Sequence, residues 1–86
     1  MRIWKYALNV IDQQCITMPR NAKILTVQMQ DDICCLWALV DETAKFTEHR
    51  NIAIYGTGNP MPDNPGTYIA TFQMHGGALV FHAFEL

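Results

Sequence analysis

The sequence of 86 residues contains no serine, and this absence excludes the serine hydrolases. Its three histidines and three cysteines show neither HxH nor CxxC spacing, although a metal site needs three or four converging ligands. Adjacent cysteines seldom bridge each other, because neighbouring side chains of a strand point to opposite faces. The chain therefore predicts no metal site, no cofactor, and free thiols at Cys15, Cys34 and Cys35, at least two of them buried.

Positive charge is also scarce, with six lysines and arginines against eight acidic residues and no basic cluster. Because affinity for duplex nucleic acid rests largely on neutralising phosphates, no nucleic acid duplex is expected as a partner. Long apolar runs are missing as well. No stretch reaches the roughly 20 apolar residues that a membrane span requires, so we expect no membrane association.

Apolar residues, by contrast, make up 50% of the chain, and only 16% of the residues are charged. This balance predicts a single folded domain over residues 1–86. A domain of this size buries only about 60 to 65% of the surface that its unfolded chain exposes. Its stability as a monomer would be modest, so we expect a homo-oligomer.

Alternation of apolar and polar residues predicts six or seven short strands and no helix of ten or more residues. Trp37 is expected near the middle of the core, and Leu25, Val27 and Met29 are expected on one face of their strand. Residues 41–48 could hold a helical turn or a long hairpin loop. The predicted fold is all-β, a small antiparallel β-sandwich or barrel. The predicted strands cover residues 2–10, 15–18, 22–30, 34–40, 50–56, 67–74 and 78–86.

Residues 56–66, with the sequence GTGNPMPDNPG, form the longest predicted loop and contain three glycines and three prolines. The backbone amides of Gly56, Thr57 and Gly58 could form a concavity that binds an anion. Arg50, one strand away, is a candidate partner for a phosphate group. The plainer interpretation of the same residues is a tight turn followed by a loop stiffened by proline.

Tyr55 and Tyr68 flank this loop, and we predict that they contact a ligand. His75 precedes a glycine pair that predicts the turn of the closing hairpin, and its backbone could approach a ligand closely. The alternative interpretation is that the tyrosines belong to the core and that His75 marks a hairpin turn. We expect His49 and His82 to be structural or surface residues. No nucleophile lies beside an identifiable base, so the sequence assigns no catalytic residue.

Five segments of the chain form a pattern that can be compared with known families: WKYxLxV (residues 4–10), MPRNAKILTVQMQ (18–30), CLWALVD (35–41), GTGNP (56–60) and TFQMHGGALVFHAFE (71–85). Together they resemble a family of small proteins of unknown function that tailed bacteriophages and prophages encode. The resemblance covers nearly the whole chain in the same order, but it brings no established activity and no catalytic residues. It implies a phage protein in the host cytoplasm with an accessory or counter-defence role.

The preferred hypothesis is a non-enzymatic binding protein, a homo-oligomer that sequesters a small anionic, nucleotide-like signal of the host. One alternative is an inhibitor that docks on a host protein through a sheet edge or an exposed patch. Another is a structural or assembly accessory of the phage particle. An enzyme is the least favoured class, because both a nucleophile–base pair and a set of metal ligands are missing.

Overall fold

The computed structural model describes residues 1–86 as seven β-strands and one short 3-10 turn, η1 (His75–Gly77). The strands form two antiparallel sheets, with the orders β1-β4-β3 and β2-β5-β7-β6. The predicted all-β fold of six or seven short strands is confirmed. No helix has the length and apolar character needed to cross a membrane. The strands are β1 (Arg2–Leu8), β2 (Gln13–Pro19), β3 (Lys23–Gln30), β4 (Ile33–Val40), β5 (Thr47–Gly56), β6 (Thr67–Met74) and β7 (Leu79–Glu85).

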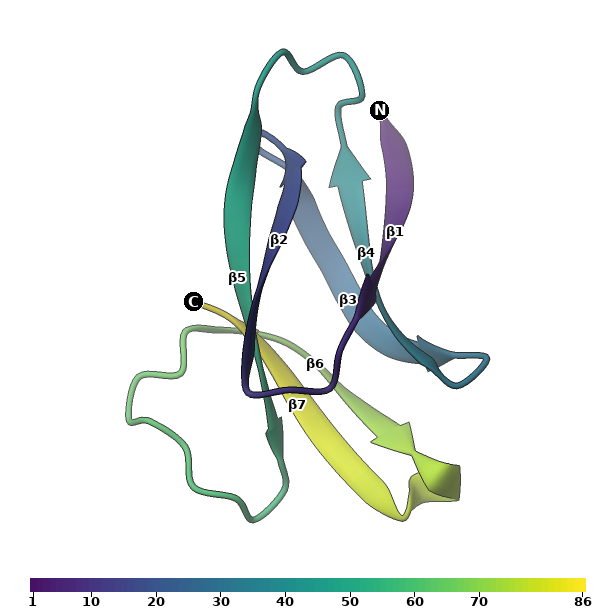
Figure 1. Cartoon of the computed structure of the whole chain (residues 1–86), viewed down its shortest axis with the longest axis vertical. Helices are drawn as coiled ribbons and strands as arrows, with labels where there is room; N and C mark the ends of the chain where they lie inside the picture. The colour runs from purple at the N-terminus through teal and green to yellow at the C-terminus, as the bar shows by residue number, and fades with distance from the viewer.

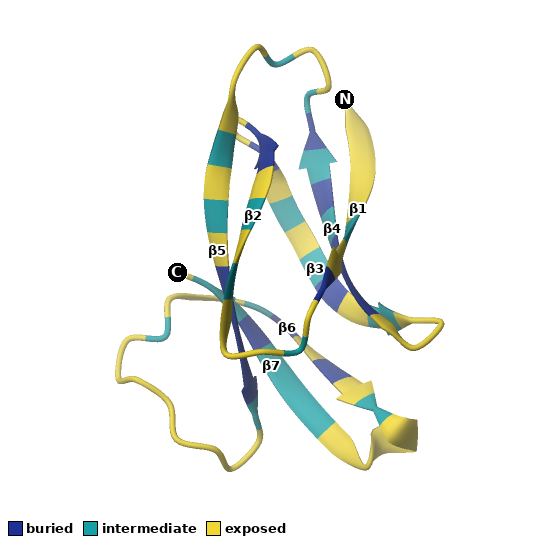
Figure 2. Ribbon diagram, in the orientation of Figure 1, coloured by how far each residue is buried: buried dark blue, intermediate teal, exposed yellow.

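The two sheets enclose a thin core between them (Figure 1). Along one side, β3 of the three-stranded sheet lies beside β6 of the four-stranded sheet without sharing a ladder. Val27 and Leu36 from the first sheet and Ile52 and Phe72 from the second are at most 2% exposed. Burial is concentrated in β4 and in the second half of β5, whereas the loop after β5 is almost entirely exposed (Figure 2).

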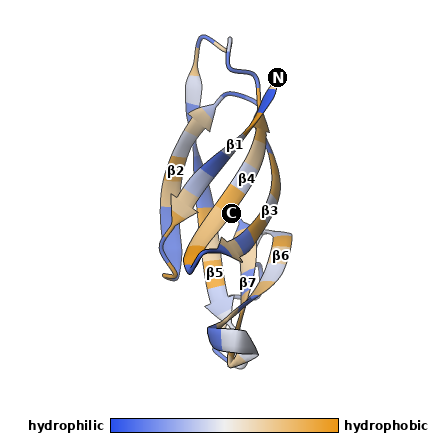
Figure 3. Cartoon of the chain, turned by 90° about the vertical axis from the view of Figure 1, so that its right-hand side faces the viewer, coloured by the Kyte–Doolittle hydropathy of each residue, from blue (hydrophilic) through white to orange (hydrophobic).

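Strand β4 is the central and most hydrophobic strand of the three-stranded sheet (Figure 3). Leu36 and Ala38 are fully buried on its inner face. Because successive side chains of a strand alternate between faces, Trp37 must lie on the outer face. There it is half-buried and in register with Lys5 on β1 and Thr26 on β3. The expectation that Trp37 lies near the middle of the core is therefore wrong.

The alternation of β3 is interrupted by a bulge. Its register against β4 shifts between Ile24 and Thr26, so Leu25 is an extra residue and is 41% exposed. Ile24, Val27 and Met29 are the residues of β3 that pack against the core. The expectation that Leu25 shares a face with Val27 and Met29 is wrong, because a bulge inserts one residue and reverses the alternation on one side of it.

Residues 41–46 cross from β4 to β5 as a loop, without a helical turn. The Asp41 carboxylate accepts hydrogen bonds from the Thr43 hydroxyl (2.6 Å) and from the Thr43 amide (3.0 Å). These bonds hold the pKa of Asp41 below its usual value. The Arg20 amide donates to the Phe46 carbonyl at 3.0 Å, which ties the loop to the turn between β2 and β3.

The three cysteines are free, as predicted. Cys34 and Cys35 are buried, and Cys15 on the edge strand β2 is exposed. Burial, together with the neighbouring Cys35, raises the pKa of the Cys34 thiol to about 11. Cys34 is therefore a protonated, inert thiol at neutral pH.

Candidate functional site

A groove of about 410 Å³ lies at the seam where the edge strands β3 and β6 run side by side. Each strand has a bulge at this place, because the ladder of β3 skips Leu25 and the ladder of β6 skips Ile69. A bulge leaves one residue unpaired and bends its strand, so the two bulges shape the groove from both sides. We call it the seam groove. Its lining residues are Ala22, Lys23, Ile24, Leu25, Arg50, Thr67, Tyr68, Ile69 and Glu85.

Lys23 on β3 and Tyr68 on β6 are exposed residues that line the seam groove from opposite strands, and the exposed Thr67 precedes Tyr68. The Tyr68 ring is held edge-on against Phe84, with the ring centroids 5.7 Å apart, yet the residue is 57% exposed. The Lys23 ammonium takes part in none of the ion pairs of the chain. The groove thus combines a fixed aromatic ring with a free positive charge.

Arg50 lies deeper in the groove, on the inner face of β5, and its side chain is only 18% exposed. It forms a two-bond ion pair with Glu85 on β7, through Nε and through Nη2, which lies 2.9 Å from Oε1. Its Nη1 donates to the Ala22 carbonyl at 2.7 Å and to Glu48 at 3.3 Å. Arg50 therefore joins both sheets, since Ala22 directly precedes β3.

These contacts leave Arg50 little capacity to bind the phosphate group that the sequence predicts as its partner. The hydrogen bond to Glu85 raises the pKa of Arg50, and nearly all of its donor groups already have acceptors within the chain. The Glu85 carboxylate also offsets the positive charge of Arg50 inside the groove. An incoming phosphate would therefore meet the free Lys23 ammonium before it could compete for Arg50.

Behind Tyr68, hydrogen bonds cross the outer face of the four-stranded sheet. The Tyr68 hydroxyl lies 2.8 Å from Thr71 Oγ1, which lies 3.0 Å from His82 Nδ1. On the other side of the ring, His82 Nε2 lies 2.8 Å from Thr57 Oγ1, and the Thr57 hydroxyl is 3.2 Å from the Val80 carbonyl. The register explains this meeting, because His82 pairs with Thr71 on β6 and with Tyr55 on β5.

One proton arrangement satisfies every group of this chain of hydrogen bonds. Tyr68 donates to Thr71, Thr71 donates to Nδ1 of His82, Nε2 of His82 donates to Thr57, and Thr57 donates to the Val80 carbonyl. In this arrangement Nε2 of His82 donates and Nδ1 accepts. Both ring nitrogens are held by neutral hydroxyl groups, so His82 orients Tyr68 rather than forming an acid–base pair with a carboxylate.

The remaining predicted residues lie elsewhere. Tyr55 is 8% exposed and packs against Phe84, with the ring centroids 6.2 Å apart, so it is buried, although it does not belong to the core cluster between the sheets. Gly56 and Thr57 border a separate hollow of about 330 Å³. The Thr57 amide donates to the Val80 carbonyl at 3.0 Å, and the Asn59 amide donates to the Gly56 carbonyl at 3.1 Å. These two amides of the loop are therefore engaged within the chain, and the Cβ position of Gly58 faces open space.

His75 lies in the turn η1 and not at the seam groove. Its φ of 53° is in the left-handed region, which is uncommon for a residue other than glycine. It borders a cavity of about 450 Å³ together with Asp32, from the turn between β3 and β4. The residues predicted as one site are thus divided: Arg50 and Tyr68 share the seam groove, Thr57 joins it through His82, and His75 belongs to another cavity.

Sequence reasoning missed Lys23, Thr71 and His82. Lys23 lies in the segment 22–30 that the sequence predicts as a strand, but nothing local indicates that β3 runs beside β6. Thr71 and His82 face each other because the two strands of the closing hairpin pair in continuous register from the turn as far as Ala70, before the bulge at Ile69. The short hairpin turn was the one available signal, since it limits the residues that can pair across it.

The fold defines a small two-sheet β domain with a groove at the seam between its sheets. The chain belongs to the family described as a domain of unknown function (DUF7352), whose model matches residues 1–86. No curated protein and no solved structure matches the chain.

Proposed function

We propose that this protein is a non-enzymatic binding protein that takes up a small nucleotide-like molecule in the seam groove. One observation carries the proposal: two bulges, one on β3 and one on β6, shape a groove whose lining includes both the exposed Tyr68 and Lys23, which forms no ion pair. The groove volume of about 410 Å³ suits such a ligand, since small-molecule sites have volumes of roughly 300 to 1,000 Å³.

Tyr68 would hold the planar base of the ligand. Stacking of a base on an aromatic ring contributes about 1–3 kcal/mol and tolerates different bases. Phe84 and Thr71 already hold the Tyr68 ring by an edge contact and a 2.8 Å hydrogen bond. Binding would therefore cost little loss of side-chain freedom at Tyr68, which favours affinity.

Lys23 would hold the phosphate. Its ammonium has no ion pair to give up, whereas Arg50 would have to leave Glu85. Arg50 contributes in another way, by tying β5 and β7 to the backbone at Ala22 and so fixing the floor of the groove. A charge-assisted contact of this kind is sensitive to salt because Lys23 is exposed.

The lining of the groove supports binding rather than catalysis. It includes no histidine and no cysteine, and its one carboxylate, Glu85, is engaged by Arg50. The resemblance to phage-encoded proteins suggests what the ligand does: a nucleotide-derived signal of host defence, which this protein would sequester in the host cytoplasm. We expect the binding form to be a homo-oligomer, because the monomer is small.

Isothermal titration calorimetry with a panel of nucleosides, mononucleotides and cyclic dinucleotides tests the proposal. We expect nucleotides to bind and Tyr68→Ala to weaken them by about tenfold or more, given the stacking contribution. Lys23→Gln should weaken nucleotides but leave the corresponding nucleosides unchanged. Lys45→Gln, which removes another exposed lysine in a loop, is the matched control.

Two results would contradict the proposal. Absence of binding to the whole panel would remove the nucleotide class. Equal losses with Lys23→Gln and Lys45→Gln would mean that the phosphate is attracted by net charge and not held at the groove.

A second candidate function, docking on a host protein, is favoured by the outer face of the three-stranded sheet. Ile3 and Ile33 are 61% and 52% exposed there, and Trp37 and Leu39 are half-buried between them. Apolar side chains clustered on one face are typical of contact surfaces. Ile33→Glu should abolish such docking and leave nucleotide binding intact, so the two functions can be separated by one variant.

A further inference from the structure

The two ends of the molecule differ in the side chains that they expose and in shape. At one end, the turn between β2 and β3 and the loop 41–46 lie together (Figure 1). At the other end, the turn between β3 and β4 and the turn η1 lie on either side of a cavity. We call them the loop end and the cavity end. Neither end includes Tyr68 or Lys23, the residues proposed to bind a nucleotide.

The cavity end contains a cavity lined by one aspartate and two methionines. Its cavity of about 450 Å³ is lined by Met29, Asp32, Gln73, Met74, His75 and Gly76, with no lysine or arginine among them. Asp32 forms none of the ion pairs of the chain. The thioethers of Met29 and Met74 are polarizable and adapt to an aliphatic or aromatic partner. The cavity is thus lined by two thioethers and one carboxylate, without lysine or arginine.

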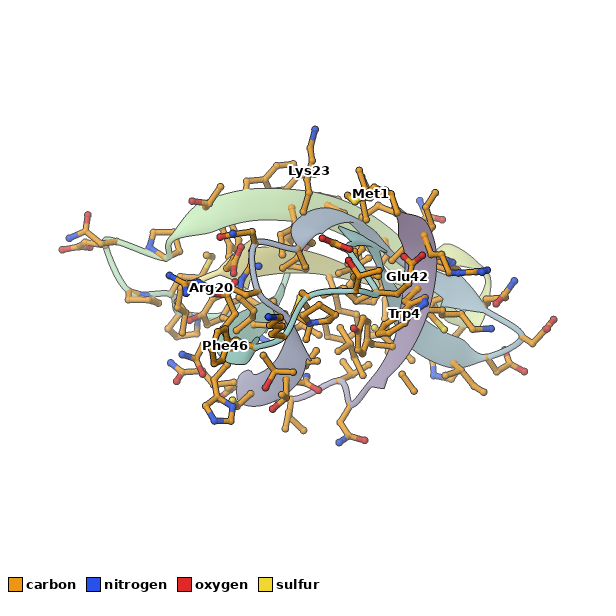
Figure 4. All side chains as sticks on the ribbon, turned by 90° about the horizontal axis from the view of Figure 1, so that it is seen from above. Met1, Trp4, Arg20, Lys23, Glu42 and Phe46 are labelled. Carbon is orange, nitrogen blue, oxygen red and sulfur yellow. The ribbon has the colours of Figure 1, made fainter.

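The loop end offers a protruding cation beside an exposed aromatic ring. Arg20 is exposed at the tip of its turn and forms no ion pair. Its amide donates to the Phe46 carbonyl at 3.0 Å, and Phe46 is 66% exposed. Arg20 and Phe46 lie next to each other in the view onto this end, whereas Trp4 and Glu42 lie apart from them (Figure 4).

We propose that copies of this chain associate head to tail, with Arg20 and Phe46 of one copy seated in the cavity between the hairpin turns of the next. The Arg20 guanidinium would pair with the Asp32 carboxylate, and the Phe46 ring would pack on the thioethers of Met29 and Met74. Charge complementarity favours this occupant, because neither Arg20 nor Asp32 has an ion-pair partner within its own chain and an aromatic ring accompanies only the cation. A head-to-tail contact is heterologous, so it closes into a ring or extends as a filament.

Sedimentation velocity over a concentration series tests this inference. The wild-type chain should self-associate, and association should weaken with added salt because the pair is exposed. Arg20→Glu and Asp32→Lys should each weaken self-association by roughly tenfold or more, because an attraction becomes a repulsion. Mixing the two variants should restore association, since the mixture again contains an intact Arg20 and an intact Asp32. Asp63→Lys makes the same charge change on the exposed long loop and should have no effect.

A second variant at Asp32 controls for the possibility that Asp32→Lys disturbs the turn. Asp32 has a φ of 64°, a conformation that asparagine tolerates well, so Asp32→Asn removes the charge while preserving the turn. A wild-type chain that stays monomeric up to roughly 1 mM would overturn the inference. So would association that survives Arg20→Glu and Asp32→Asn but fails with Ile33→Glu, because that pattern means pairing through sheet faces. Binding of an arginine-rich peptide by a monomeric wild type, lost in Asp32→Asn, would assign the cavity to a different partner and would overturn it too.

Discussion

The three-stranded and the four-stranded sheet share one core but differ in what their outer faces carry. Outside β1-β4-β3, Trp37 and Leu39 are half-buried among residues that make few polar contacts. Outside β2-β5-β7-β6, hydrogen bonds run from Tyr68 through His82 to Thr57. On the outer face of the three-stranded sheet, burial of apolar area is therefore the main stabilising contribution. On the outer face of the four-stranded sheet, hydrogen bonds fix the orientation of the side chains. Substitutions in the two sheets should therefore have different signatures.

The largest effect is expected where the four-stranded sheet meets the core. Arg50→Ala leaves Glu85, with a side chain 23% exposed, without its partner, and removes the contact to Ala22. We expect the free energy of unfolding to fall by about 3 kcal/mol. Urea denaturation measures it, with Arg20→Ala, an exposed arginine without an ion pair, as the control. A loss equal to that of the control would mean that the ion pair contributes nothing to the four-stranded sheet.

In the three-stranded sheet, the buried thiol of Cys34 should make the stability of the protein depend on pH at alkaline values. The raised pKa of Cys34 means that the unfolded thiol ionises above its ordinary pKa of 9.0 while the folded thiol stays protonated to about pH 11. The contribution of Cys34 to the free energy of unfolding is therefore complete below pH 9. It is lost as the pH rises from 9 through 11, and the total loss is about 2–3 kcal/mol. Cys34→Ala should flatten this part of the profile relative to wild type. A slope that the substitution leaves unchanged would assign the loss to other groups.

The outer face of β4 provides the next comparison. Trp37→Thr removes a half-buried ring, and we expect a loss of about 2 kcal/mol from the apolar area returned to water. Nucleotide binding at the seam groove should not change. Thermal unfolding and calorimetric titration of the same preparation give the two readouts. If Trp37→Thr weakened nucleotide binding while the fold remained intact, the two outer faces would not be independent.

A smaller change of opposite sign is expected at β1. The Tyr6 hydroxyl is buried without a hydrogen-bond partner, and burial raises the pKa of Tyr6. Tyr6→Phe removes this unsatisfied group and should raise the free energy of unfolding by about 1 kcal/mol. Chemical denaturation at pH 7 measures the change. Destabilisation instead would indicate that the hydroxyl contributes through a bridging water.

The smallest effect on stability is expected on the outer face of the four-stranded sheet. Thr71→Val keeps the shape of the side chain but removes the hydroxyl between Tyr68 and His82, and we expect a loss below about 1 kcal/mol. The informative readout is the tautomer of His82 from ¹⁵N NMR shifts. The wild type should carry the proton on Nε2, and the variant should show a mixture of tautomers. A wild-type proton on Nδ1 would reverse the direction of the chain of hydrogen bonds.

Much of the fold could be predicted from the sequence, because side-chain alternation is a local property. The closing hairpin illustrates this: residues 67–74 were predicted as a strand, and β6 has the same bounds. The site could be predicted only in part. Tyr68 does line the groove, but Arg50 is engaged by Glu85, which is 35 positions away in the sequence. No local pattern distinguishes an arginine with such a partner from a free one.

The sequence by itself determined the class of the fold, the long glycine- and proline-rich loop, and the lack of serine and of metal-site spacings. These follow from composition and from periodicity along a few consecutive residues. Only the tertiary structure decided how the strands divide between two sheets, that Trp37 faces outward, and that Lys23 and Tyr68 line the same groove. The physical reason is that strand register and bulges depend on pairing between distant segments, and an insertion of one residue such as Leu25 reverses which side chains share a face.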